Sequence, residues 1–250
     1  MFNMASGEEF TDSGMESETN SQGNRLLAGF TNMERDQLID RGERLRIPFG
    51  EVICEPGQPS RYVYFPITGI LSSVISLNDG SAVETAMIGN EGLAGIPAIF
   101  NMRSTPVRVV GRLEGDALRV AVSDVHEILA GSPAARDLIG RYALTLFHQS
   151  AQNAACNLRH RLDQRMCRWL AATADRAART EFRVTQEFLG EMLGVSRQSI
   201  NTTAGTLHEK GLITYSRGRL AIADRARLEA AACECHEAAR TAYHRLMHAA

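Results

Sequence analysis

The clearest pattern of apolar and polar positions lies in residues 185–212. Apolar side chains recur there at spacings of three and four, in two short runs on either side of Gly194: Phe188, Leu189, Met192, Ile200, Ala204 and Leu207. Such runs are typical of amphipathic helices. Thr185 and Ser196 precede them as N-cap residues, and a glycine between helices adopts the left-handed conformation without steric cost. The pattern predicts two helices around a tight turn.

A longer helix without a breaker is predicted over residues 132–157. Ser132 can cap it, and Pro133 takes the first helical position, where proline is favoured. One stripe of this helix repeats at spacings of three and four, as a seam for a second helix does. If the second helix belongs to another copy of the chain, this stripe is a dimer interface. The residues expected there are Leu138, Tyr142, Thr145, Leu146, Gln149 and Asn153. Because the lower half of the stripe is polar, a helix packed only on its own domain is the alternative.

Before this helix the pattern changes to short strands with Gly and Pro turns. The expected strands lie within 50–59, 61–66, 69–77, 83–89, 107–110 and 117–120. Asn78-Asp79-Gly80 is a hairpin turn between two of them, and Thr31 with Glu34 predicts a capped helix ahead of them. This spacing predicts an antiparallel β-roll, or jelly roll. With the helices it gives an α+β fold.

The chain divides into five predicted segments. Residues 1–24 are rich in Ser, Gly and Glu and poor in branched apolar residues, which predicts a disordered tail. The β-roll occupies 25–131 and the long helix 132–157. A helix-turn-helix domain with a wing follows in 158–228, and a C-terminal helix in 229–250.

The second helix of the helix-turn-helix leaves a polar outer face. Arginine, glutamine and asparagine on such a face can make bidentate hydrogen bonds to base edges in a major groove. Residues 213–222 predict a β-hairpin, whose arginines would meet phosphates as a wing. The candidate DNA-binding residues are Thr185, Ser196, Arg197, Gln198, Ser199, Asn201, Thr202, Arg217 and Arg219. An ordinary helical hairpin with a solvated face is the alternative.

Charge is unevenly distributed along the chain. Residues 1–157 carry 12 Arg and 19 Asp or Glu, a balance of −7, whereas residues 158–250 carry 14 Arg, Lys210 and 10 Asp or Glu, a balance of +5. The basic part favours double-stranded DNA as a partner. No apolar run approaches the ~18 residues of a membrane span, and no secretory signal is visible. Because the 5 cysteines lack a framework spacing, we expect a cytoplasmic protein with no membrane partner.

These motifs resemble one known family. Residues 185–222, together with the run RHRLDQRMCRWL at 159–170, are similar to the winged helix-turn-helix of the Crp–Fnr family of bacterial transcription regulators. The segments 56–57, 64–69, 79–80 and 88–89 resemble the family's cyclic-nucleotide-binding-type β-roll. The resemblance implies a β-roll sensor domain, a homodimer through the long helix, a palindromic operator and RNA polymerase as a partner.

The chain departs from the family where nucleotide is bound. Nucleotide-binding members carry a Gly-Glu-Leu run and an Arg-Ser/Thr pair, which align here with Gly95-Ile96-Pro97 and Arg108-Val109. Isoleucine cannot accept a hydrogen bond from ribose, and valine supplies no hydroxyl. We therefore expect no specific cyclic-AMP response. Arg108 alone is a weak candidate for effector binding. Any effector is expected in the apolar β-roll pocket or at a cysteine; the alternative is a constitutive protein whose activity is set by its abundance.

The second helix of the helix-turn-helix, which would read the bases, also departs from the family pattern. Where the family usually presents a Glu, then a Ser or Gly, then an Arg, this chain has Gln198, Asn201 and Thr202. Glutamine and asparagine suit adenine N6 and N7 rather than cytosine N4. The operator is therefore expected to depart from the family's usual TGA-type core.

No constellation of residues predicts an enzyme or a cofactor, because phosphate-loop, zinc-protease and nucleophile-elbow motifs are missing. Cys233-x-Cys235-His236 is the one Cys/His cluster in the sequence. On a continuous final helix starting at Asp224, positions 233 and 235 point about 200° apart, so we predict structural cysteines and no metal. Two functions stay open: a dimeric transcription regulator, or a β-roll scaffold whose C-terminal helices dock a protein.

Overall fold

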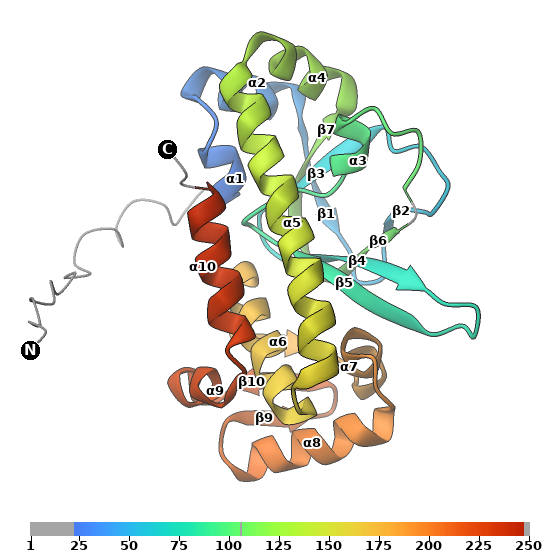
Figure 1. The fold of residues 1–250 in the computed structure, drawn as a ribbon, viewed down its shortest axis with the longest axis vertical. Helices are drawn as coiled ribbons and strands as arrows, with labels where there is room; N and C mark the ends of the chain where they lie inside the picture. Colours follow the sequence, from blue (N-terminus) through green and yellow to red (C-terminus); the bar gives the residue numbers. More distant parts are fainter. Residues whose placement is uncertain (1–22, 106, 248–250) are drawn as a thin grey trace, which may run out of the picture.

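The computed structural model describes residues 23–105 and 107–247 (Figure 1). The predicted tail at 1–24 lies outside these residues, apart from its last two positions. A β-roll forms one end of the molecule and a helical domain the other, and one long helix runs between them (Figure 1). Among the described helices none is long and apolar enough to span a membrane.

Two short helices precede the β-roll, α1 (Arg25–Ala28) and α2 (Asn32–Arg41). Asn24 caps α1 by accepting a hydrogen bond from the backbone N–H of Leu27. α2 starts with the predicted capping box, in which Thr31 and Glu34 exchange side-chain-to-backbone hydrogen bonds. Both helix starts are therefore set by local sequence.

Two antiparallel sheets form the β-roll, which confirms the predicted fold. Their strand orders are β1-β7-β3 and β2-β6-β4-β5. The strands are β1 (Glu43–Ile47), β2 (Val52–Cys54), β3 (Tyr62–Pro66), β4 (Ile70–Ser76), β5 (Ala82–Ile88), β6 (Arg108–Leu113) and β7 (Gly115–Ala121). Sequence reasoning missed β1, because it carries three charged residues and buries only Ile47.

Three helices follow strands of the β-roll. They are α3 (Ile96–Ile99) after β5, α4 (Val122–Gly131) after β7, and the long α5 (Pro133–Arg159). Ser132 caps α5 by accepting from the Ala135 N–H at 3.1 Å, and Pro133 opens it, as predicted. α5 runs along most of the length of the molecule, from the β-roll end to the helical domain (Figure 1).

Residues 162–231 form a small helical domain with a three-stranded sheet of order β8-β10-β9. Its elements are α6 (Leu162–Ala177), β8 (Glu181–Arg183), α7 (Gln186–Leu193), α8 (Arg197–Glu209), β9 (Ile213–Ser216), β10 (Arg219–Ile222) and α9 (Arg225–Ala231). The predicted helix-turn-helix is α7 and α8, and the predicted wing is the β9–β10 hairpin. Residues of all four helices and of the wing share one apolar core.

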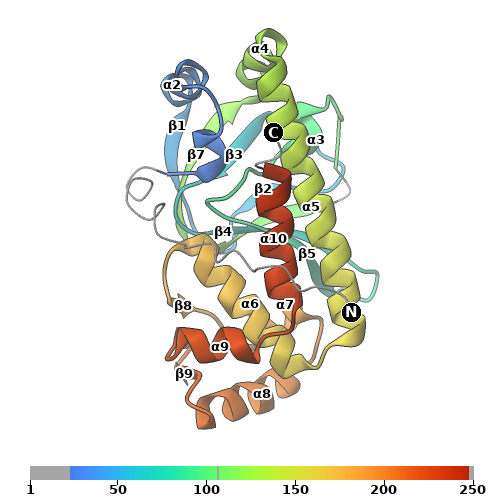
Figure 2. The ribbon, with the colours of Figure 1, turned by 60° about the vertical axis from the view of Figure 1, so that its left-hand side comes forward.

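The predicted single C-terminal helix is wrong. Asp224 caps α9, but α9 ends at Ala231 and a new helix, α10 (Cys235–Met247), begins after a break. α10 returns antiparallel along α5 (Figures 1 and 2). The break also removes the geometric ground for excluding a metal site, because Cys233 and Cys235 no longer lie on one helix.

The predicted dimer face of α5 turns toward the interior of its own chain. The residues concerned are Leu138, Tyr142, Thr145, Leu146, Gln149 and Asn153. Four of them are buried, and Leu146 and Gln149 are half-buried. Gln149 Oε1 accepts a hydrogen bond from the Met87 N–H of β5 at 3.0 Å. These residues therefore pack within the chain, and their assignment as dimer contacts is corrected.

The outer face of α5 carries a different apolar seam. Leu144, Phe147 and Leu158 are 54%, 74% and 84% exposed, and Ala151 and Ala154 are exposed between them. Leu144, Ala151 and Leu158 are seven residues apart, as are Phe147 and Ala154. A seven-residue repeat of this kind is typical of a helix that packs against a second helix.

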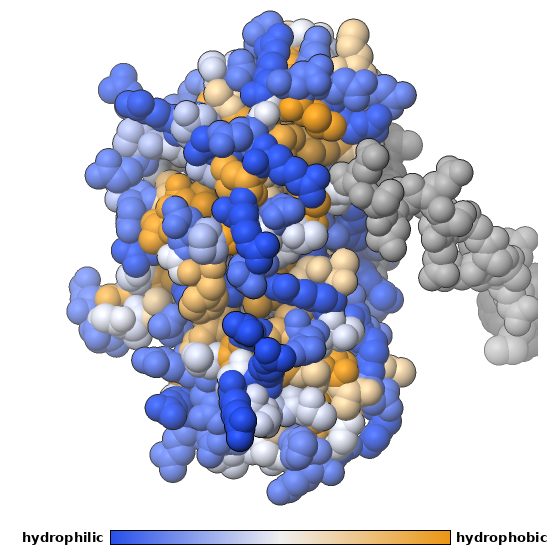
Figure 3. Space-filling model, turned by 180° about the vertical axis from the view of Figure 1, so that it is seen from behind, coloured by the Kyte–Doolittle hydropathy of each residue, from blue (hydrophilic) through white to orange (hydrophobic). Residues whose placement is uncertain are grey.

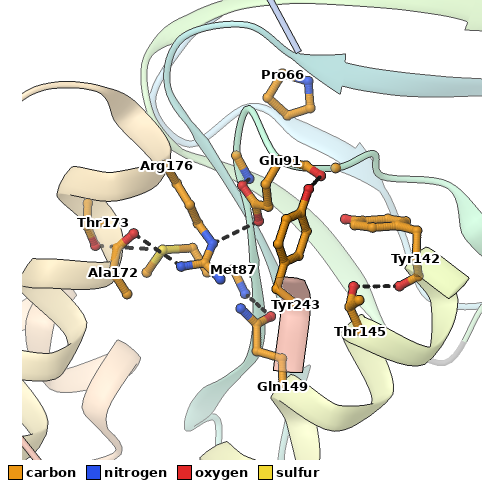
Figure 4. A network of polar contacts seen from close by, with 12 residues as sticks. Pro66, Met87, Glu91, Tyr142, Thr145, Gln149, Ala172, Thr173, Arg176 and Tyr243 are labelled. Atoms are coloured by element: carbon orange, nitrogen blue, oxygen red, sulfur yellow. Dashed lines mark hydrogen bonds and ion pairs between the residues drawn. The ribbon is translucent and has the colours of Figure 1, made fainter. Parts of the chain in front are cut away.

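The two domains are joined by buried polar contacts as well as by apolar packing. Ile70 and Met87 of the β-roll belong to the same core as the α6 residues. Figure 4 shows Arg176 of α6 reaching Glu91, whose carboxylate lies 2.8 Å from Arg176 Nε. Tyr243 of α10 donates to the Glu91 backbone carbonyl at 2.9 Å. The β-roll, α6 and α10 thus meet at Glu91.

Candidate nucleic-acid interface and effector pocket

The turn between α7 and α8 is fixed by local interactions. Gly194 ends α7 with φ 63°, in the region that favours glycine. Thr185 Oγ1 accepts from the Phe188 N–H at 3.1 Å, and Ser196 Oγ accepts from the Ser199 N–H at 3.2 Å. Both predicted caps are confirmed. They fix where α7 and α8 begin, and α8 has its polar face outward.

A groove of about 580 Å³ lies between α8, the start of α7 and the wing. We call it the candidate DNA-facing groove. It is lined by four of the predicted DNA-binding residues, Thr185, Arg197, Asn201 and Arg217. Arg217 sits at the wing tip with φ 48°, next to Gly218. The fold therefore brings together two arginines that are separated by 20 positions in the sequence, on either side of a space open to solvent.

The other predicted DNA-binding residues lie beside this groove. Gln198 and Thr202 are exposed one turn apart on α8, and the Thr202 hydroxyl donates to the Gln198 carbonyl at 3.2 Å. Ser196 and Ser199 are engaged in the helix cap. Arg219 is exposed on β10 and forms an ion pair with a carboxylate of β8 at 3.6 Å. These residues extend the polar surface beyond the groove.

Sequence reasoning missed Gln186 and Tyr215, which line the groove together with His208 of the outer face of α8. Gln186 Nε2 donates to Asn201 Oδ1 at 2.8 Å, so a residue of α7 orients a candidate reading residue of α8. Tyr215 donates to the backbone carbonyl of Val184 at 3.2 Å and so ties the wing to β8. No sequence pattern indicates these pairings, because they join separate elements.

A second groove, of about 970 Å³, lies on the other side of the wing. The arginines that line it are Arg112, Arg179, Arg183, Arg217 and Arg219, alongside two glutamates. The end of the molecule that carries α8 and the wing presents mainly hydrophilic side chains when seen from behind (Figure 3). A surface rich in arginine around a protruding hairpin suits contact with phosphates.

A cavity of about 260 Å³, partly open to solvent, lies in the β-roll beside α5. Its wall is mainly apolar, with Ile88, Ile96 and Val109 among the lining residues, and its polar groups include the hydroxyls of Ser73 and Thr85. The described residues that line it include no Arg, Lys, Asp or Glu. Burial raises the pKa of the Cys54 thiol in this wall, which favours the neutral thiol over the reactive thiolate. The cavity therefore suits an uncharged guest.

Arg108 does not line this cavity, so its assignment as an effector residue is wrong. Its neighbours Val107 and Val109 face the cavity, and successive residues of a strand point to opposite faces. Arg108 Nε instead lies 3.0 Å from a carboxylate oxygen of Glu55, in an ion pair that is partly open to solvent.

Two protein families match the chain. Residues 44–132 match the cyclic nucleotide-binding domain, and residues 164–231 match the Crp-like helix-turn-helix domain. The chain belongs to the Crp–Fnr family of transcription regulators. As a Crp–Fnr regulator it is a DNA-binding protein. This favours the transcription regulator over the β-roll scaffold, the two functions that the sequence left open.

Solved structures share the fold of this Crp–Fnr regulator at low sequence identity. A Crp/Fnr-family regulator from Eubacterium rectale is 19% identical, with a TM-score of 0.63, over 82% of this chain and 96% of that chain. A CRP-family regulator from Thermus thermophilus is 20% identical, with a TM-score of 0.64, over 75% and 96%. FixK2 from Bradyrhizobium japonicum is 16% identical, with a TM-score of 0.64, over 77% and 98%. A search of curated proteins gave no match.

Proposed function

We propose that this regulator binds a palindromic operator as a homodimer, with the recognition helix at 196–210 in the major groove. The observation that carries the proposal is the groove in which Arg197 and Asn201 of α8 face Arg217 of the wing. Side chains of this kind on a helix can reach base edges, while a wing arginine can hold phosphate. A symmetric dimer would contact two half-sites one helical turn apart.

Base reading is assigned to the outer face of α8. Gln198 and Asn201 have the amide groups that pair with adenine N6 and N7. Arg197 has a guanidinium that fits either guanine or a phosphate oxygen. Thr185 caps α7 and Ser199 lies beside the cap of α8, so both are placed at helix starts, where they can contact phosphates of the DNA. This set differs from the family's usual reading residues, so the preferred operator should differ too.

Dimerisation is assigned to the outer seam of α5. Leu144, Phe147 and Leu158 are the large apolar residues of this seam, and they are exposed in the single chain. Two copies of α5 packed along the seam would bury them and place two DNA-binding domains at the same end of the assembly. Such a pair has the two-fold symmetry that a palindrome requires.

The β-roll cavity is assigned to a small, largely apolar effector. A cyclic nucleotide would bring a phosphate charge into a wall without a cationic partner, and an unpaired buried charge is costly. The cavity also borders α5 through Leu146, Phe147 and Ser150. An effector bound there would therefore contact the helix that carries the proposed dimer seam.

The regulator is further proposed to act in the cytoplasm and to change transcription through RNA polymerase at the promoter. The described cysteines are all free thiols, which suits a reducing compartment.

A salt titration of DNA binding tests the proposal. The purified chain should bind duplex DNA in a gel-shift assay, and its affinity should fall linearly with salt on logarithmic axes because bound arginines release counterions. Absence of binding at low salt would contradict the proposal and would support a scaffold role instead.

A further inference from the structure

Four side chains that commonly bind metals meet where α5 ends. Cys156 lies in the last turn of α5 and His160 is its C-cap residue, while Cys233 lies in the break between α9 and α10 and Cys235 is the first residue of α10. Their ligand atoms all lie within 4.8 Å of one another. The three cysteines are 0%, 3% and 1% exposed. None of the four lines the DNA-facing groove or the β-roll cavity.

We propose that this cluster binds one Zn²⁺ ion as a tetrahedral Cys₃His site. With Zn–S near 2.3 Å and Zn–N near 2.0–2.1 Å, tetrahedral geometry puts two sulfurs about 3.8 Å apart and a sulfur and a nitrogen about 3.5 Å apart. The Sγ atoms of Cys156 and Cys233 are 3.5 Å apart, and Cys235 Sγ lies 3.5 Å from His160 Nδ1. These two distances match a tetrahedral zinc site, and because all four ligand atoms lie within 4.8 Å of one another, small side-chain adjustments would bring the whole set around one ion.

Contacts outside the four ligands orient them for a metal. His160 turns Nδ1 toward the sulfurs, and its Nε2 lies 3.0 Å from a carboxylate oxygen of Glu234. A carboxylate on the second ring nitrogen keeps the proton there and leaves the first nitrogen as the ligand, as in zinc sites generally. Gln152 Nε2 donates to Cys235 Sγ at 2.9 Å, which suits a thiolate. Both contacts hold the ligand atoms, His160 Nδ1 and Cys235 Sγ, in place within the cluster.

The ligand set also decides the kind of metal. Thiolates and imidazole select zinc over magnesium or calcium, which prefer oxygen. A cluster of several irons would distribute its thiolates over different iron atoms, whereas these four ligands converge on one point. A disulfide needs sulfurs about 2.05 Å apart and would leave the histidine without a role. When Zn²⁺ binds, the thiol protons are released to solvent.

The site would fasten the C-terminal helix to the rest of the regulator. It joins the end of α5 to the start of α10, which lies along α5 (Figure 2). α10 reaches the domain interface through Tyr243 and Glu91 (Figure 4). Loss of the ion should therefore loosen α10 and lower thermal stability, without removing any residue of the DNA-facing groove.

The test uses the full chain, purified in a reducing buffer without chelator. Elemental analysis should find about one zinc per chain. After the zinc is removed, Co²⁺ should restore the thermal stability and give the visible bands of tetrahedral cobalt together with a near-ultraviolet thiolate-to-cobalt band. Cys233→Ser should lose zinc and change the cobalt spectrum. Cys54→Ser, the same change at a cysteine outside the cluster, should keep both.

A milder variant protects the test against misfolding. Glu234 is exposed, so Glu234→Gln should fold normally, and it should weaken zinc affinity by about 10- to 100-fold by removing the partner of His160. Protein without zinc whose cobalt spectrum lacks thiolate bands would overturn the proposal. So would a Cys156–Cys233 disulfide that persists in the protein purified in reducing buffer, or equal zinc affinity in wild type and Glu234→Gln.

Discussion

At the scale of single residues, Glu84 is a buried carboxyl group that links the β-roll to the DNA-binding domain. Its Oε1 accepts from Trp169 Nε1 at 3.1 Å, and its Oε2 contacts the Ser72 hydroxyl. Burial raises the pKa of Glu84, although both hydrogen bonds and nearby arginines act in the opposite direction. The stabilisation from such a group is complete below the unfolded pKa of about 4.3 and is lost as pH rises through the folded pKa.

Glu84→Gln should therefore become more stable than wild type as pH rises from about 4 to about 8, because the amide keeps both contacts and cannot ionise. Glu84→Ala leaves the Trp169 N–H without a partner and should lose about 1–3 kcal/mol of unfolding free energy. Urea unfolding across this pH range measures both. If wild type instead becomes more stable relative to Glu84→Gln as pH rises, ionisation of the buried Glu84 carboxyl does not destabilise the fold.

The wing arginines give a second prediction at this scale. Arg217→Ala should weaken binding to all DNA sites alike and lower the salt slope by about one, because it removes a phosphate contact. Arg219→Ala should act in the same direction. Arg35→Ala, at the opposite end of the molecule in α2 (Figure 1), is the matched control and should bind as wild type. A change of base preference in Arg217→Ala would show that the wing reads sequence.

At the scale of elements, the exposed seam of α5 makes a definite prediction about the dimer. Leu144→Glu with Leu158→Glu places charges in the seam and should give folded monomers with weakened operator binding. Ala134→Glu, an exposed residue of the same helix outside the seven-residue repeat, should leave the dimer intact. Sedimentation equilibrium and circular dichroism measure association and folding separately. An unchanged dimer in the double variant would place the interface elsewhere.

The same helix shows what a sequence can and cannot predict. Ser132 and Pro133 identified its start, as Thr185 and Ser196 did for the helix-turn-helix, because a cap involves residues three positions apart. The face that α5 buries was predicted wrongly, because α10 and β5 cover it and both are distant in the sequence. Cys233 shows the same limit, since its cluster depends on a helix break that no local signal marked.

At the scale of the whole molecule, α5 connects the β-roll, which holds the cavity, with the domain that carries the DNA-facing groove. The cavity contacts α5 through Phe147, which is also a residue of the proposed dimer seam. The DNA-binding domain is fixed to the β-roll by the buried pair of Glu91 and Arg176. An effector that moves α5 would therefore alter the spacing of the two reading helices in the proposed dimer.

Cyclic AMP is not expected to act in this way. Isothermal titration calorimetry of the full chain with cyclic AMP should show no micromolar binding, because Ile96 stands at the ribose position and the cavity wall lacks a cation. Operator affinity should likewise be unchanged by the nucleotide. Saturable micromolar binding with one nucleotide per chain would contradict the assignment of an apolar effector.

The central claim is that α8 reads DNA, and selection of binding sites from random duplexes tests it most directly. Wild type should select a palindrome with half-sites one helical turn apart. Gln198→Ala should cost about 1–3 kcal/mol on that site and relax one base position, equally in both half-sites. If Gln198→Ala selects the same sequence as wild type at every position, α8 is not the reading helix.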